Sequence, residues 1–277
     1  MHRLGVCSWS LRPQSPRDLA AKVQATGLRA VQLALEPIRT AKWDEQETVR
    51  TLREAGITLL SGMMETAGED YTTLESIRAT GGVRPSATWE QNRRATRQYA
   101  TLAQRLGLRL VTLHAGFLPH DPRDAERKVM LERLLEIART FAEHGVSIAL
   151  ETGQEDAATL LPVLRELASA QVGVNFDPAN MILYGMGDPV RALEELAAHV
   201  VQVHVKDAMS AKTPGTWGTE VPVGTGQVAW DRFFKVVRER RPGVALVIER
   251  EAGEQRIEDV RLAKQLVERL VQEDLQP

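Results

Sequence analysis

Eight short β-rich runs, each followed by a segment of helical periodicity, recur along the whole chain and constrain its fold more than any other feature. Alternating β and α segments with nearly continuous apolar strands favour a parallel sheet covered by helices. Eight such units in 277 residues predict an α/β fold, a (β/α)₈ TIM barrel that forms a single domain over residues 1–277. The runs are 4–9, 30–35, 57–63, 108–114, 146–151, 172–177, 200–206 and 245–250.

Residues that favour helix starts and ends stand at positions that agree with this division of the chain. Ser15 with Pro16 and Asp188 with Pro189 are typical of helix starts. A doubly wound open sheet remains an alternative, but eight repeats and the absence of Gly-x-Gly-x-x-Gly after the first strand favour the barrel. Glycines stand where the preceding helices should stop, at Gly27, Gly56, Gly107 and Gly145.

Composition narrows the class of function. The net charge is −2, and no cluster of Lys or Arg suggests binding to nucleic acid. Cys7 is the one cysteine, which excludes an intrachain disulfide and favours a reducing cytoplasmic location. Without an apolar run of ~20 residues or a leader pattern, we expect no membrane partner. A small-molecule substrate is therefore the favoured partner, and a homo-oligomer stays open.

Two connections are unusually long, and both follow strands. In a barrel, segments 64–87 and 207–227 would lie over the C-terminal mouth, where long loops form lids or substrate walls, although plain spacers are an alternative. The second contains Gly224-Thr225-Gly226, which could be a backbone anion site or a plain tight turn.

Four of the later strands end on residues that can bind a metal. Glu151, Asp177, His204 and Glu249 terminate strands five to eight, and the first two spacings, 26 and 27 residues, are each one βα repeat. Three converging buried carboxylates would repel one another without a cation. Because of this repulsion, we predict one divalent ion on these four residues. The alternative is that each acid caps a helix or pairs with an arginine.

The donor set also indicates which ion to expect. Three carboxylates and one imidazole form a hard, oxygen-rich set that suits Mn²⁺ or Mg²⁺ better than copper or a structural zinc site. Zn²⁺, Co²⁺ and Fe²⁺ stay open.

Five further residues near the strand ends are candidates for substrate binding. Lys206 could hold a substrate hydroxyl or be a solvated charge, and His114 could contact substrate or be structural. Trp9 could stack on a sugar or pack in the core. Asn180 could hydrogen-bond at the mouth, or could simply suit a turn. Glu65, just past strand three, has the weakest case.

Several motifs in order along the chain resemble those of the xylose isomerase-like barrel superfamily, particularly its sugar phosphate isomerase and epimerase branch. They are GVCSWS, LET, NFDPAN, VHVKD, PVGTGQVAW and VIERE, and the resemblance covers essentially the full chain. It implies a metal-binding Glu-Asp-His-Glu set in which two glutamates, here Glu151 and Glu249, also transfer protons. The DNA-repair endonuclease branch differs, because Asn180 stands where that branch has a histidine ligand.

The resemblance implies a metal-dependent enzyme of carbohydrate metabolism, an isomerase or epimerase of a sugar, sugar phosphate or keto-acid. One glutamate would take a proton from the carbon beside a carbonyl, giving an enediolate, and the other would return it. Two alternatives stay open: a dehydratase of inosose or dehydroshikimate type, and a sugar-binding barrel without turnover.

Overall fold

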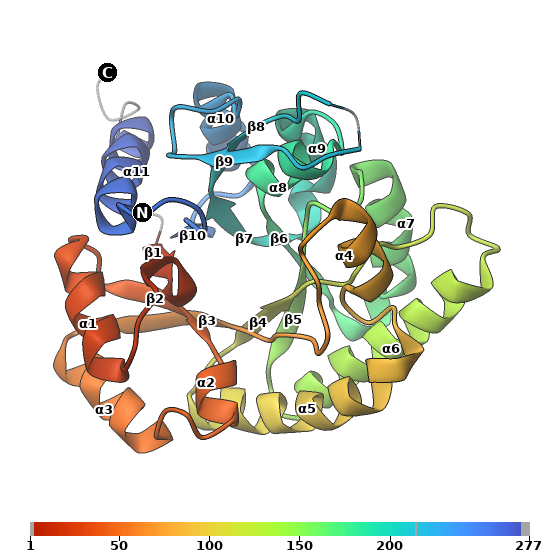
Figure 1. The fold of residues 1–277 in the computed structure, drawn as a ribbon, viewed down its shortest axis with the longest axis horizontal. Helices are drawn as coiled ribbons and strands as arrows, with labels where there is room; N and C mark the ends of the chain where they lie inside the picture. Colours follow the sequence, from red (N-terminus) through yellow and green to blue (C-terminus); the bar gives the residue numbers. More distant parts are fainter. Residues whose placement is uncertain (1–2, 214, 273–277) are drawn as a thin grey trace.

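The computed structural model describes residues 3–213 and 215–272, and these form a closed parallel barrel surrounded by helices (Figure 1). The strand order round the barrel is β1-β10-β7-β6-β5-β4-β3-β2, which confirms the predicted (β/α)₈ fold. The barrel strands are β1 (Leu4–Cys7), β2 (Ala30–Ala34), β3 (Thr58–Met63), β4 (Leu110–Leu113), β5 (Ser147–Glu151), β6 (Gly173–Phe176), β7 (Val200–Val205) and β10 (Ala245–Ile248).

The helices begin and end where local chemistry favours it. Ser15 Oγ accepts from the backbone N–H of Asp18 at 3.2 Å, and Asp188 Oδ1 caps its helix in the same way. The α-helices are α1 (Pro16–Ala25), α2 (Glu36–Arg39), α3 (Glu45–Glu54), α4 (Leu74–Thr80), α5 (Ser86–Arg105), α6 (Ala125–Ala142), α7 (Ala157–Glu166), α8 (Pro178–Tyr184), α9 (Pro189–Leu196), α10 (Trp230–Arg240) and α11 (Arg256–Gln272). Short 3₁₀ helices are η1 (Ser8–Leu11), η2 (Ala168–Ala170) and η3 (Ala197–His199).

All eight predicted strands are present, but several end earlier than expected. The run 4–9 leaves the sheet after Cys7, and Trp9 lies in η1 rather than in a strand. The expected ends at Asp177, Lys206 and Arg250 lie one or two residues beyond β6, β7 and β10. Residues at the barrel mouth therefore follow the strands and are free to turn inward.

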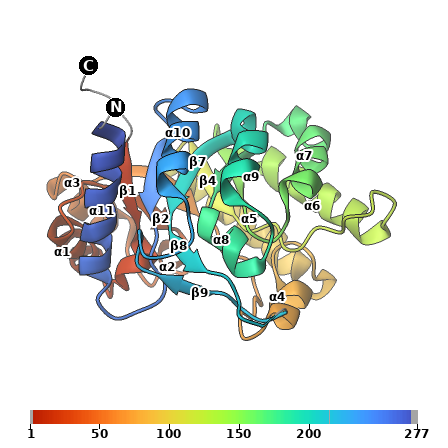
Figure 2. The same cartoon turned by 90° about the horizontal axis from the view of Figure 1, so that it is seen from above.

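Both long connections contain regular structure. Segment 64–87 includes α4, whose first turn is closed by a reciprocal capping box between Thr73 and Ser76. Segment 207–227 forms an antiparallel hairpin of β8 (Asp207–Met209) and β9 (Thr219–Val221). Figure 2 shows α4 and the β8–β9 hairpin at the same end of the barrel.

The Gly224-Thr225-Gly226 turn is an anion site, and the anion is a side chain of this chain. Asp207 accepts hydrogen bonds from the backbone N–H groups of Gly224, Gly226 and Val228 at 2.9–3.1 Å. The indole of Trp230 also donates to Asp207, at 2.9 Å. A Cβ on Gly226 would come within 2.1 Å of that carboxylate, so a glycine is required there.

The inside of the barrel is polar near its centre. Apolar strand residues such as Val31, Leu33, Val203 and Val205 are buried, as expected for a barrel covered by helices. The residues between them carry polar side chains that are also fully buried. This polar layer, which we call the interior polar layer, consists of Gln32, Ser61, Thr112, Asn175, Gln202 and His204.

Among the described residues, no helix combines the length and apolar character needed to cross a bilayer.

The Asp207 contacts predict a clear stability effect. Asp207→Asn replaces an acceptor-only carboxylate with an amide that also presents donors, so we expect roughly 2–4 kcal/mol lower free energy of unfolding by urea denaturation. Asp188→Asn is the matched control, because Asn caps helices about as well as Asp. Equal stability of the two variants would show that the turn does not depend on this carboxylate.

Candidate metal centre

Four ligand-type side chains from four neighbouring strands converge at the barrel mouth. Glu151 ends β5, Asp177 follows β6, His204 lies in β7 and Glu249 follows β10. From His204 Nδ1 the distances are 3.5 Å to Glu151 Oε1, 3.6 Å to Asp177 Oδ2 and 3.4 Å to Glu249 Oε2. All four side chains are buried, and their ligand atoms lie within 4.8 Å of one another. The structure thus brings together the whole set predicted from the sequence.

Each carboxylate is held in place by neutral donors. Trp9 Nε1 donates to Glu249 Oε1 at 2.7 Å, and the backbone N–H of Asn180 donates to Asp177 Oδ1 at 2.9 Å. Glu151 accepts from Asn180 Nδ2 at 3.0 Å and from Asn175 Nδ2 at 3.1 Å. One oxygen each of Asp177 and Glu249 is thereby left to face the common centre.

The interior polar layer determines which nitrogen of His204 carries a proton. Because a carboxylate only accepts, the amide group of Asn175 must donate to Glu151, and Asn175 Oδ1 then accepts from Gln202 Nε2 at 3.2 Å. Gln202 Nε2 also donates to Gln32 Oε1 at 2.9 Å. His204 Nε2 lies 2.8 Å from the same Gln32 oxygen and 3.1 Å from Asn175 Nδ2, and the shorter contact favours a proton on Nε2 that is donated to Gln32.

In the neutral form that can bind a metal ion, His204 would present the lone pair of Nδ1 toward three carboxylates. Asp177 Oδ2 and His204 Nδ1 are buried without a hydrogen-bond partner, and Glu249 Oε2 faces them with the Lys206 ammonium group 3.0 Å away. Buried acceptors that face one another need a cation between them. Ligand atoms 3.4–3.6 Å apart suit a central ion with bonds of about 2.1 Å. The residues present therefore fit a divalent metal ion.

The ionisation of these groups follows the same electrostatics. Without a cation in the site, burial would lower the pKa of His204, but Cys7, Glu151 and Glu249 raise it well above its ordinary value. Burial raises the pKa of Asp177. Burial also opposes ionisation of Glu249, but Lys206 and His204 outweigh it and hold the pKa of this carboxyl well below its ordinary value.

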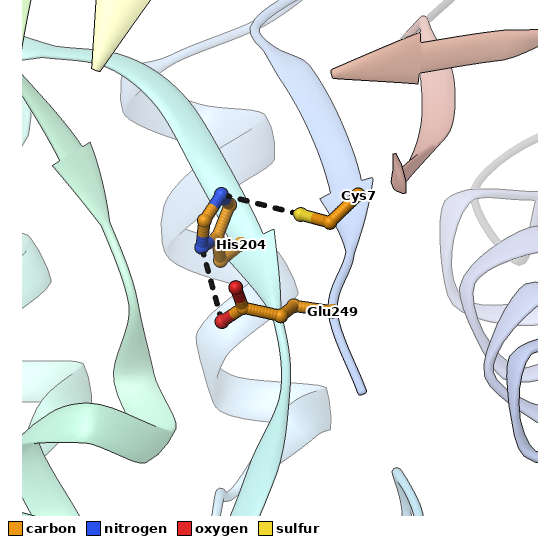
Figure 3. Close-up of side chains that lie close together, drawn as sticks. All are labelled: Cys7, His204 and Glu249. Carbon is orange, nitrogen blue, oxygen red and sulfur yellow. Dashed lines mark hydrogen bonds and ion pairs between the residues drawn. The ribbon is translucent and has the colours of Figure 1, made fainter. Parts of the chain in front are cut away.

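Cys7 lies on the other side of the His204 ring from Glu249 (Figure 3). Its Sγ is 3.7 Å from His204 Nε2 and 3.6 Å from Gln32 Oε1. Burial raises the pKa of the Cys7 thiol, so it is neutral at ordinary pH. Cys7, His204 and Glu249 are close enough to form a second three-residue ligand group. The Nε2 side already faces Gln32, however, so the four-residue set is the better metal centre.

Three of the predicted substrate-binding residues lie directly beside this centre. Lys206 Nζ is 3.0 Å from Glu249 Oε2 and donates to Asn180 Oδ1 at 3.2 Å. Burial would lower the pKa of Lys206, but Glu249 and Glu251 raise it well above its ordinary value. Trp9, through its indole bond to Glu249, completes this group.

The remaining two candidates, His114 and Glu65, differ in position. His114 Nε2 is 3.8 Å from Glu151 Oε1. Burial would lower the pKa of His114, but Glu151 and Glu69 raise it. The side chain of Glu65 is exposed at the rim and is not part of the metal centre.

Two adjoining cavities open above the metal centre. The inner one, about 400 Å³, is lined in part by Glu151 and Glu249, and the outer one, about 440 Å³, by Glu65. Their shared wall brings residues from distant segments together. It consists of Trp9, Met63, Tyr71, His114 and Glu251.

Sequence reasoning missed several residues of the site. Glu251, which binds Lys206 Nζ at 2.5 Å, lies two residues beyond a predicted ligand. A polar amide residue inside an otherwise largely apolar run was the available signal for Gln32, Asn175 and Gln202, which lie in AVQLA, GVNF and VVQVHV. The aromatic residues Tyr71, Tyr184 and Trp217 had no readable pattern.

Comparison with known proteins places the chain among similar barrels. A Planctomyces limnophilus structure described as a xylose isomerase domain protein is 30% identical, with a TM-score of 0.86 over 91% of this chain and 92% of that one. A Mycobacterium smegmatis xylose isomerase-like TIM barrel protein in complex with magnesium is 15% identical, with a TM-score of 0.70 over 92% of this chain and 87% of that one, and shares the fold.

A curated relative carries a more specific name. The probable L-ribulose-5-phosphate 3-epimerase UlaE of Mycoplasma pneumoniae is 23% identical over 202 residues, which are 68% of this chain and 63% of that protein. The chain spans less than two thirds of the curated relatives that it matches.

The sequence profile of the xylose isomerase-like TIM barrel family matches residues 20–271. That range runs from the first helix to the end of the last and contains every residue of the metal centre. Together with the 30% identity to the Planctomyces structure, this match shows that the chain belongs to the xylose isomerase-like TIM barrel family.

Proposed function

We propose that the chain is a divalent-metal-dependent sugar isomerase or epimerase. One observation carries this proposal: three buried ligand atoms, Asp177 Oδ2, His204 Nδ1 and Glu249 Oε2, face one point at the barrel mouth, and the first two lack a hydrogen-bond partner. Active sites of such barrels lie at this mouth. The epimerase name of the Mycoplasma relative supports the reaction class.

Glu151, Asp177, His204 and Glu249 would hold the ion. Three oxygen donors and one imidazole favour Mn²⁺ or Mg²⁺, and the magnesium complex of the Mycobacterium protein supports this choice. A bound divalent ion would supply Lewis acidity, polarising the substrate carbonyl and stabilising the negative charge of an enediolate.

Glu249 and Glu151 are the proposed proton-transfer groups. Trp9 holds one oxygen of Glu249, while Asn180 and Asn175 hold Glu151 from behind, so both carboxylates are fixed in orientation. The two come from β5 and the end of β10, separated in the barrel by β6 and β7. One carboxylate would remove the proton beside the carbonyl, and the other would return a proton from the other side or at the adjacent carbon.

Lys206 would act beside Glu249 as a fixed positive charge. Its ammonium group keeps Glu249 ionised and lies close enough to bind a substrate oxygen that gains negative charge during the reaction. The aromatic side chains of Trp9, Tyr71, Tyr184 and Trp217 form part of the cavity walls, which suits the apolar faces of a sugar.

The first prediction concerns metal binding. After removal of metals by chelation, Mn²⁺ titration followed by electron paramagnetic resonance should give one tight site per chain. Asp177→Ala should weaken Mn²⁺ binding more than about 100-fold, because even changes outside the ligand shell cost about 10–100-fold. Asp188→Asn, at a helix start, is the control. Full-affinity Mn²⁺ binding by the Asp177 variant would exclude this site.

The second prediction concerns proton transfer. Glu249→Gln should retain the fold but lower deuterium incorporation from solvent into substrate by about 10²–10⁴-fold. The assay uses a panel of ketoses, ketose phosphates, inososes and keto-acids with added Mn²⁺, and metal content is measured in each sample. Glu254→Gln, at an exposed position, is the control. Unchanged exchange in a metal-loaded Glu249 variant would remove this residue from the mechanism.

The third prediction concerns the interior polar layer. Gln32→Leu removes the acceptor that holds the proton on His204 Nε2, so metal affinity should fall by about 10–100-fold. Nitrogen NMR of the imidazole should show a mixture of tautomers in place of a single Nε2–H form. Gln265→Leu, exposed on α11, serves as the control. Retention of one tautomer would show that Gln32 has only a packing role.

A further inference from the structure

We propose that the site accepts an uncharged, polyhydroxylated carbonyl compound and rejects sugar phosphates and sugar acids. This inference rests on the proposed function, because it concerns the same cavities. Most charged side chains that line the two cavities are carboxylates: Glu65 and Glu69 in the outer one, Glu151 and Glu249 in the inner one, and Glu251 in both. Among the described lining residues there is no arginine, and Lys206 is the one lysine.

The positive charge of Lys206 is already paired with carboxylates of the protein. Its Nζ lies 3.0 Å from Glu249 Oε2 and 2.5 Å from Glu251 Oε2, and it donates to Asn180 Oδ1 at 3.2 Å. An ammonium group has three N–H donors, and three oxygens surround it here. A phosphate group would have to displace a carboxylate to pair with this lysine.

With all of its carboxylates ionised, the site carries a net negative charge even when His114 is counted as protonated. Six carboxylates are present when Asp177 is included with the five that line the cavities. Lys206, a protonated His114 and one divalent ion would supply four positive charges. A phosphate dianion would therefore enter a cavity that already carries two net negative charges, which opposes its binding.

Several backbone hydrogen-bond donors at the mouth are already used by carboxylates of the protein. The N–H groups of Gly224, Gly226 and Val228, in the loop region where barrels often bind phosphate, all donate to Asp207. The first turns of α7 and α8 are capped by Asp156 and Asp177. At these three places an internal carboxylate occupies donors that a substrate phosphate could otherwise use.

The same cavities suit a neutral polyol. Carboxylates accept hydrogen bonds from hydroxyl groups, and those of Glu65 and Glu251 are exposed at the mouth. Tyr184 and Trp217 pack edge to face, with ring centroids 4.9 Å apart, in the wall of the inner cavity. Acceptors beside aromatic surfaces match a molecule with hydroxyl donors and C–H faces and no charge.

Matched substrate pairs test this inference. The Mn²⁺-loaded protein is incubated in deuterated solvent with D-tagatose and D-tagatose 6-phosphate, D-fructose and D-fructose 6-phosphate, and L-ribulose and L-ribulose 5-phosphate. We expect exchange in a neutral ketose, with kcat/KM for its phosphate ester lower by on the order of 100-fold or more. Equal or faster exchange in a phosphate ester would overturn the inference while supporting the proposed function.

Charge-neutral variants show whether the cavity carboxylates cause this selectivity. The double variant Glu65→Gln, Glu69→Gln should raise the ratio of phosphate-ester to neutral-ketose kcat/KM by about tenfold. The control, Glu54→Gln with Glu143→Gln, makes the same change in net charge at exposed positions just before β3 and β5, at the opposite end of the barrel. An unchanged ratio in the first variant, or the same rise in both, would contradict the cavity argument.

A binding measurement separates this inference from the proposed function if no ketose exchanges. Complete absence of exchange counts against the isomerase or epimerase proposal. Electron paramagnetic resonance of the bound Mn²⁺ is then followed during titration with inorganic phosphate and, separately, with xylitol. Weaker perturbation by phosphate than by xylitol supports an anion-rejecting site, whereas tighter binding of phosphate overturns it.

Discussion

Three buried carboxylates that surround one imidazole nitrogen are the interaction on which the organisation of the barrel mouth depends. Removing such charges from water costs several kcal/mol each unless a cation and hydrogen bonds compensate. The protein supplies neutral donors from Trp9, Asn175 and Asn180 and one cation, Lys206. Asp177 and His204 each keep a buried atom without a partner beside Glu249, and a divalent ion at this point would supply the remaining positive charge.

The interior polar layer explains why part of the barrel core is not apolar. Barrel interiors are usually filled by branched apolar side chains, which pack without any need for partners. Here Gln32, Asn175 and Gln202 replace them, and each amide finds a defined donor or acceptor. A fully satisfied network of this kind is rigid, and it transmits the acceptor character of Glu151 through three side chains to His204. Binding of an ion at the proposed centre would therefore depend on the structure of the core.

The walls of the mouth are held by contacts of their own. Arg250 pairs with Glu220 in the β8–β9 hairpin and with Asp259 in α11, each at 2.8 Å. Glu220 also accepts the backbone N–H groups of Glu251 and Ala252. These backbone hydrogen bonds hold Glu251, whose carboxylate binds Lys206, in place. The acidic side chains that line the mouth are thus held in position by specific contacts. We infer that the same carboxylates determine whether a charged substrate can bind.

Local patterns in the sequence determined the eight strands, the helix starts at Ser15 and Asp188, and the four ligand-type residues, because periodicity, capping and strand ends are short-range properties. Only the tertiary structure decided what meets across the barrel: Gln32 with His204, Trp9 with Glu249, and Asp207 with the turn at Gly224–Gly226. The last pairing shows the reason most plainly. The Gly224–Gly226 sequence is equally compatible with a turn that binds an external anion and with one that binds Asp207, 17 residues earlier in the chain. The two cases differ only in the distance between the turn and that carboxylate, which is set by the folded barrel.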